Sequence, residues 1–396
     1  MATPTGRVRA AEPGRGGTAV GPRRHILLAA ATALAMLAPA SCASAQAESS
    51  PAASSPRVTT VVTGLDIPWD VTWIGSTMLY NERPGRVWSL RPGGVPVRVS
   101  LPLPRIFHGS EAGLLGMVAD PHAGDNRLFY TCQSVARADG SASDVQVWKW
   151  RLVNDARAVK VAVLVKGIPI GYGRHNGCRL RFRSDHMLYI GTGDAARGTN
   201  PQNLKSLGGK VLRVRSDGSI PRSNPFYGKG GNARYVWNYG HRNVQGLALR
   251  PGTNQLWTAE HGPDRDDEVN LVLKGRNYGW SPTPGYNESR PMTDTKRFPK
   301  AVAARWRSGY PTVATSGATF LSGGQWGVWN GVLAIAELKG SGILLFGVAA
   351  GDRLTRVDRI ATGYGRIRTV AQGPDGALYF TTSNGTSDAI YRLALS

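Results

Sequence analysis

This sequence contains no haem-attachment motif, no sustained helical periodicity and, after residue 45, no long apolar stretch. After residue 45 no apolar run is long enough to span a bilayer, which excludes a transmembrane helix from the following part of the chain. No segment sustains the spacing of apolar residues typical of an amphipathic helix, so a mainly helical fold is not expected. The absence of a Cys-x-x-Cys-His segment excludes covalently attached c-type haem.

Acidic residues are also few. The 26 Asp and Glu are outnumbered by 48 Lys and Arg, which gives a formal net charge of +22 over 396 residues. The basic residues are spread thinly and form neither a Lys/Arg run nor a basic helix, so we do not expect a nucleic-acid partner. An anionic small molecule or an anionic cell envelope fits this charge better.

The one long apolar run lies near the start, between Arg23-Arg24 and the small residues that end at Ala45. This pattern predicts an export signal peptide over residues 1–45, and the paired arginines allow a twin-arginine route. The Ala-, Ser- and Pro-rich residues 46–57 are predicted to form a flexible linker. The folded domain is then expected to occupy residues 58–396.

The chain has only three cysteines. Cys42 offers an alternative, lipidated end to the signal, although Pro39 makes a poor lipobox, and membrane attachment would depend on that lipidation. Removal of the signal would leave Cys132 and Cys178, which we predict to form a disulfide in an oxidising compartment. The alternative is that two thiols so distant in sequence never meet.

A pair of short strands recurs six times along the chain. The first strands of the pairs contain residues 78–80, 127–130, 187–190, 255–257, 331–335 and 377–380. Their leucines are about 45 to 77 residues apart, which suits four-stranded blades with variable loops. The sequence therefore predicts an all-β, six-bladed β-propeller, in which residues 58–62 complete the blade begun at the C-terminus. A pair of β-sandwiches is the alternative.

Polar residues gather at the ends of the predicted inner strands, where the loops of a propeller converge on its channel. The candidates are Glu111, Arg174, His175, Asp194, Arg242, Asn243, His261, Tyr310, Thr312, Lys339, Arg366 and Arg368. Several converging Arg and Lys side chains indicate an anionic ligand with more than one carboxylate or phosphate, because their mutual repulsion would otherwise be costly.

The segment from Gly240 to Glu268 is the densest of these clusters. Its Gly262-Pro263 pair allows two successive carbonyl oxygens to point at a hard cation such as Ca²⁺. The plainer interpretation of this fragment is an acidic surface turn.

Two motifs in this region are specific. Gly-His-Arg-Asn-x-Gln-Gly begins at Gly240, and Glu-His-Gly-Pro-x-x-x-Asp-Glu-x-Asn begins at Glu260. With residues 111–121, 175–194, 311–314, 337–340 and 365–375, they resemble the soluble pyrroloquinoline quinone (PQQ)-dependent glucose/sorbosone and aldose sugar dehydrogenases. The resemblance spans nearly the whole chain after the signal, and it implies a six-bladed propeller that oxidises the anomeric hydroxyl of aldoses to the lactone.

The resemblance also implies roles for individual residues. His175 would be the general base while hydride passes to the quinone, Arg242 would stabilise charge on the quinone, and Asp194 would orient the base or the substrate. The residues implied for binding PQQ are Arg242, Asn243, His261, Thr312, Lys339, Arg366 and Arg368. Glu111 and Tyr310 are expected to face the substrate.

Calcium is the second implied cofactor. Carbonyls of Gly262 and Pro263 would hold one Ca²⁺, and a looser match suggests a second ion at the carbonyls of Pro284 and Tyr286 and the carboxylate of Glu288. Since no haem site is present, electrons are expected to leave to a separate acceptor. The alternatives are a non-catalytic carbohydrate- or envelope-binding propeller and a Ca²⁺-dependent lactonase-type hydrolase.

Overall fold

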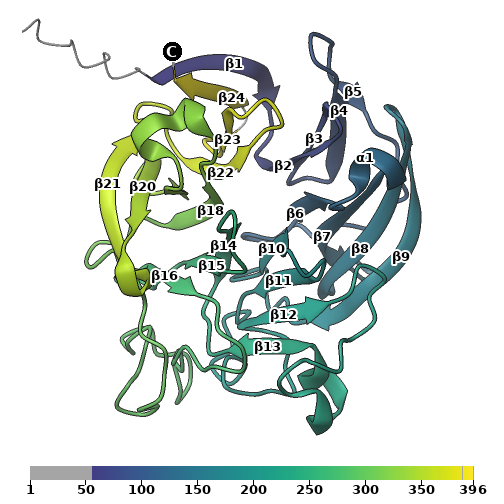
Figure 1. Ribbon diagram of the computed structural model, residues 1–396. Coiled ribbons are helices and arrows are strands. Elements are labelled where there is room, and N and C mark those ends of the chain that lie inside the picture. The colour runs from purple at the N-terminus through teal and green to yellow at the C-terminus, as the bar shows by residue number, and fades with distance from the viewer. Residues whose placement is uncertain (1–55, 386, 396) are drawn as a thin grey trace, which may run out of the picture. The chain divides into compact units, whose positions relative to one another are not determined.

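Six four-stranded antiparallel sheets form a ring (Figure 1), and their innermost strands line a central channel. The computed structural model describes residues 56–385 and 387–395, so the predicted signal peptide, Cys42 and nearly all of the linker lie outside the described residues. The ring of six sheets confirms the predicted six-bladed propeller. Within the described residues, no helix is long and apolar enough to cross a membrane.

In each blade the four strands follow one another from the channel to the outer edge. Blade one contains β2 (Pro68–Ile74), β3 (Thr77–Glu82), β4 (Arg86–Leu90) and β5 (Val97–Arg98). Blade two contains β6 (Leu114–Ala119), β7 (Leu128–Ala136), β8 (Ala142–Asn154) and β9 (Arg157–Ile168). Blade three contains β10 (Gly177–Phe182), β11 (Leu188–Thr192), β12 (Lys210–Val214) and β13 (Val236–Tyr239).

The second half of the ring repeats this plan. Blade four contains β14 (Val244–Leu249), β15 (Leu256–Glu260), β16 (Glu268–Leu271) and β17 (Trp306–Arg307). Blade five contains β18 (Thr315–Phe320), β19 (Leu333–Glu337), β20 (Gly342–Val348) and β21 (Leu354–Ile360). Blade six contains β22 (Ile367–Gln372), β23 (Leu378–Thr382), β24 (Asp388–Leu395) and β1 (Pro56–Leu65). The helical pieces are α1 (Ala123–Asn126), η1 (Tyr227–Lys229), η2 (Gly231–Tyr235), η3 (Gly324–Trp329) and η4 (Ala350–Asp352).

The first and last strands close the ring. β1 pairs antiparallel with β24, and Thr59 lies opposite Arg392. This pairing confirms that the N-terminal strand completes the C-terminal blade. The strand starts at Pro56, two residues before the boundary expected from the sequence. Joining the two ends in one sheet removes an open edge that could pair with another chain.

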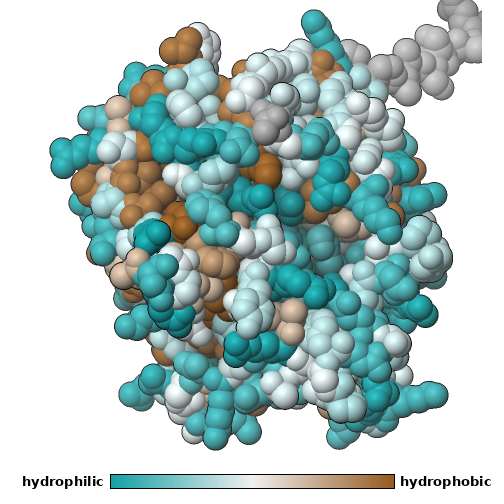
Figure 2. Space-filling model, turned by 180° about the vertical axis from the view of Figure 1, so that it is seen from behind, coloured by the Kyte–Doolittle hydropathy of each residue, from teal (hydrophilic) through white to brown (hydrophobic). Residues whose placement is uncertain are grey.

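Apolar side chains pack between neighbouring blades. Leu79 and Val87 of blade one, for example, are buried in one cluster with Phe129 and Trp150 of blade two. Burying each large apolar side chain contributes about 1.5–3 kcal/mol relative to exposing it. The face seen in Figure 2 is mainly hydrophilic, with its apolar residues gathered toward one side of the view.

All six innermost strands share one irregularity. The register with the second strand shifts near the start of β2, β6, β10, β14, β18 and β22. Such bulges bend a strand and redirect its side chains, and they often lie next to functional sites. The loops that enter these strands therefore meet at one mouth of the channel, where the sequence places its candidate residues.

The predicted disulfide is confirmed. Cys132 in β7 and Cys178 in β10 are bonded, with their Cα atoms 5.7 Å apart. Both residues are fully buried. The bond joins blade two to blade three, and Cys178 is three residues after His175.

Candidate active site

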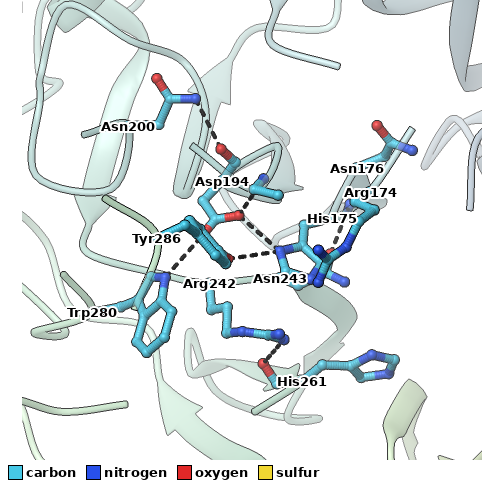
Figure 3. Close-up of polar contacts among 12 residues, drawn as sticks. Arg174, His175, Asn176, Asp194, Asn200, Arg242, Asn243, His261, Trp280 and Tyr286 are labelled. Atoms are coloured by element: carbon cyan, nitrogen blue, oxygen red, sulfur yellow. Dashed lines mark hydrogen bonds and ion pairs between the residues drawn. The ribbon is translucent and has the colours of Figure 1, made fainter. Parts of the chain in front are cut away.

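His175 lies at the channel mouth, immediately before β10, and its ring is held by two partners (Figure 3). Its Nδ1 is 2.9 Å from Oδ1 of Asp194 and 2.9 Å from the Tyr286 hydroxyl. The hydroxyl of Tyr286 donates to the other Asp194 oxygen, Oδ2, at 2.8 Å. Because Nδ1 faces a carboxylate, the neutral ring keeps its proton there and presents the lone pair of Nε2 for proton abstraction.

Asp194 follows β11 and is completely buried. Besides His175 and Tyr286, it accepts hydrogen bonds from the indole of Trp280 at 2.7 Å and from the backbone N–H of Ala196 at 2.8 Å. These donors stabilise the carboxylate and fix its orientation. Asp194 is therefore built to hold the imidazole of His175 in one position.

The loop behind Asp194 is held by a buried cation. The ammonium of Lys210 donates to the carbonyls of Asn200, Pro201 and Gly208 at 2.7, 3.1 and 2.6 Å. Burial lowers the pKa of Lys210 to about 7, and the nearby Asp194 opposes this shift. Asn200 in turn donates to the backbone carbonyl of Asp194 at 2.9 Å. Lys210 thus holds in place the loop that follows Asp194.

The backbone around His175 is unusual. His175 and Cys178 have φ values of 55° and 74°, in the left-handed region that L-residues seldom adopt. Residues in this region are kept there by their surroundings. Here the Glu111 carboxylate accepts the backbone N–H of His175 at 3.2 Å, and the disulfide fixes Cys178.

Arg242 lies just before β14 of blade four, the blade next to the one that carries His175 (Figure 3). Its Nη1 donates to the carbonyls of His261 and Gly262 at 3.1 and 2.9 Å, and its Nη2 contacts the Glu288 carboxylate at 2.6 Å. The neighbouring Asn243 donates to Glu111 at 3.2 Å. Arg242 is only 5% exposed, so its charge acts in a poorly hydrated environment.

Arg366 and Arg368 enter the mouth from blade six. Burial and the charges of neighbouring arginines, opposed by Glu111, lower the pKa of Arg368 to about 9. Its Nη1 donates to Gln245 at 3.3 Å. Arg366 is exposed and donates to the backbone carbonyl of Ser383 at 3.2 Å.

Three nitrogens at the mouth are shielded from solvent and lack a protein partner. They are Nε2 of His261 and Nε of Arg242 and Arg368. Burial, followed by the charges of Arg368 and Arg242, lowers the pKa of His261 far below its usual value, so this ring is neutral near pH 7. Unpaired buried donors beside several cations suit an anionic ligand that carries multiple acceptors. The residues present therefore fit PQQ, the anionic cofactor that the family resemblance implies.

The Gly262-Pro263 loop is shaped by Asp267. This buried carboxylate accepts the N–H of Gly262 at 2.9 Å and those of Val313 and Ala314 at 2.8 and 2.6 Å. Within residues 56–385 and 387–395, no three His, Cys, Asp or Glu side chains come together as a metal site. A cation bound here would rely on backbone carbonyls, which are hard oxygen donors suited to Ca²⁺.

The remaining predicted residues lie around the rim. Thr312 is buried, Lys339 is exposed, and Tyr310 is 78% exposed. The segment expected at a second Ca²⁺ site contributes side chains to the mouth. The Tyr286 hydroxyl reaches His175, and the Glu288 carboxylate reaches Arg242, while the second metal site itself stays a prediction.

Several motif residues turn out to be internal supports. His241 is fully buried, with Nδ1 3.0 Å from Glu260 and Nε2 2.9 Å from Asn238. Glu260 also accepts the backbone N–H of Arg242 at 3.3 Å. The dense motif of blade four therefore supports Arg242 from behind and does not line the mouth throughout.

Comparison with known proteins agrees with this geometry. The sequence profile of the glucose/sorbosone dehydrogenase family matches residues 65–392. The aldose sugar dehydrogenase YliI of Escherichia coli is 33% identical over 342 residues, covering 82% of this chain and 90% of that protein. Quinoprotein glucose dehydrogenase B of Acinetobacter calcoaceticus is 28% identical over 256 residues, or 58% of this chain and 53% of that protein.

A solved structure extends the comparison. The PQQ-bound form of an aldose sugar dehydrogenase from Streptomyces coelicolor superposes with a TM-score of 0.70 at 27% identity. The match covers 87% of this chain and 99% of that one.

Proposed function

Because the chain belongs to the glucose/sorbosone dehydrogenase family, we propose that it is a PQQ- and Ca²⁺-dependent aldose dehydrogenase that oxidises the anomeric hydroxyl to the lactone. The observation that carries the proposal is that two features share one mouth. His175 is oriented by Asp194, and near it Arg242 and Arg368 each have a buried Nε without a protein partner. The PQQ-bound relative supports the choice of cofactor.

His175 is the proposed general base. Oxidation of an aldose removes a proton from O1 and a hydride from C1, and Nε2 takes the proton. The resulting imidazolium is stabilised by Asp194, which already accepts from Nδ1. Tyr286 and Trp280 keep Asp194 in place during this transfer, because they donate to its other oxygen.

The cationic side of the mouth binds the cofactor in this proposal. PQQ would accept the hydride when bound. Its carboxylates would be held by Lys339, Arg366 and Arg368, with Asn243, Thr312 and His261 as neutral partners. Arg242 is placed to stabilise negative charge next to the base, because its guanidinium is buried and its Nε has no protein partner.

Calcium would be held by carbonyls of the Gly262-Pro263 loop, which Asp267 keeps in shape. A cavity of about 340 Å³ adjoins Pro263 and Glu288. Substrate would contact Glu111 and Tyr310 at the rim. We further propose that the protein is exported through its N-terminal segment and passes electrons to a separate acceptor.

The test separates catalysis from cofactor binding. His175→Ala should lose about 10²-fold or more of the turnover number, because a general base typically contributes 10²–10⁴-fold. The same variant should bind PQQ with unchanged affinity in an absorbance titration. His122→Ala, which removes an exposed histidine outside the site, is the matched control. Loss of PQQ binding with residual turnover intact would make His175 a structural residue instead.

A further inference from the structure

The Glu288 carboxylate occupies a position that an anionic ligand would be expected to take. A single oxygen, Oε1, is 2.6 Å from Nη2 of Arg242 and 3.6 Å from Nη2 of Arg174. Arg174 precedes β10 and Arg242 precedes β14, so the carboxylate lies between the loops of two adjacent blades. No other side-chain carboxylate among the described residues forms an ion pair with Arg242 or Arg174.

The two arginines differ in their surroundings. The side chain of Arg242 is 5% exposed, whereas those of Arg174 and Glu288 are 51% and 40% exposed. Glu288 therefore reaches from a solvated loop to a buried cation. That loop is anchored two residues earlier, where the Tyr286 hydroxyl contacts His175 and Asp194. Only a small movement of the Glu288 side chain is needed for its carboxylate to leave Arg242 and pair with Arg174 alone.

Cofactor loading sets up a competition at Arg242. An anionic group of the cofactor brought to this guanidinium would be repelled by Glu288, since like charges at such distances oppose each other. Arg174 lies within reach and can receive the displaced carboxylate, so that no charge is left unpaired. This argument rests on the proposed function, because it takes the ligand of Arg242 to be the anionic quinone.

We infer that Glu288 is an internal competitor for Arg242 and that Arg174 is its alternative partner, so that the pair Arg174–Glu288 sets the affinity for the anionic cofactor. In the cofactor-free protein Glu288 neutralises Arg242. In the loaded protein Glu288 pairs with Arg174 instead. Neither residue is required for proton abstraction, and their effect is on binding.

The test is a double-mutant cycle on PQQ affinity, measured by absorbance titration of the full protein with Ca²⁺ present. Glu288→Gln should tighten PQQ binding about fivefold, the upper range for an ion pair with one exposed partner. Arg174→Gln should weaken binding by about two- to threefold, because Glu288 then has no second partner. In the double variant the effect of Arg174→Gln should vanish.

Asp217→Asn is the matched control, since it removes one acidic charge from an exposed turn after β12, at the end of blade three opposite the site. It should leave PQQ affinity unchanged. The inference is overturned if Glu288→Gln binds PQQ no more tightly than the unaltered protein. It is also overturned if Arg174→Gln weakens PQQ binding equally in the presence of Glu288 and in the Glu288→Gln background. If the unaltered protein and every variant fail to bind PQQ, the proposed function fails and this inference fails with it.

Discussion

Removing the Cys132–Cys178 disulfide should destabilise the propeller and loosen the backbone next to the proposed base. The bond joins β7 of blade two to β10 of blade three, and Cys178 is three residues after His175. Both cysteines are fully buried, so the bond constrains the interior of the ring and not a surface loop.

The size of the effect follows from the closed loop. The two cysteines are 46 residues apart, and the chain-entropy relation gives about 4 kcal/mol for a loop of that length. Measured losses on removing a native disulfide are about 2–5 kcal/mol. Since folded proteins are commonly stable by about 5–15 kcal/mol, this one bond is expected to supply a substantial share of the free energy of unfolding.

The assay is equilibrium urea unfolding of the oxidised protein and of the double variant Cys132→Ala/Cys178→Ala, followed by tryptophan fluorescence. The variant should lose about 2–4 kcal/mol of unfolding free energy. Chemical reduction of the unaltered protein should cause a similar loss. A loss below about 1 kcal/mol in both experiments would refute the reasoning, because it would mean that the unfolded chain is not constrained by the bond.

Two other predictions concern carboxylates. Asp194→Asn should lower the turnover number by about 10²-fold or more, because the amide cannot hold His175 as the carboxylate does. Steady-state kinetics measure this loss, and a parallel absorbance titration should show unchanged PQQ affinity. Equal losses of turnover and of PQQ affinity would count against the prediction. Burial and the neighbouring Glu260 raise the pKa of Glu268 to about 8, so its contribution to stability is present below pH 4.5 and is lost as pH rises through 8. Between pH 5 and 9 the melting temperature of Glu268→Gln should therefore fall less than that of the unaltered protein. Parallel plots of melting temperature against pH for the two proteins would contradict this.

The fold was predictable because its signals are local. Each blade contains apolar strand pairs separated by turn residues, and the strand at residues 58–62 had no partner unless the ring closed. The disulfide was predictable for a related reason, since only Cys132 and Cys178 remain after the proposed signal peptide. The candidate residues Glu111, His175, Asp194 and Arg242 also follow from their positions at strand ends.

The position of residues 280–288 at the mouth could not be predicted in the same way. Residues 280–288 have no strand or helix period, and Tyr286 meets His175 across 111 residues of sequence. Trp280 looks like an ordinary core residue until its indole is seen on Asp194. Lys210 is a similar case, because a lysine in a strand is normally expected on the surface, whereas here three carbonyls enclose its ammonium.

The most direct test of the central claim is dye-linked oxidation of a panel of aldoses by the protein lacking residues 1–45. Activity is compared with PQQ, with Ca²⁺, with both and with neither, and His175→Ala is run beside it. We expect turnover only when PQQ and Ca²⁺ are both added, with almost none in the variant. Turnover that needs no PQQ, or the lack of both turnover and any PQQ-dependent absorbance change, would contradict the account.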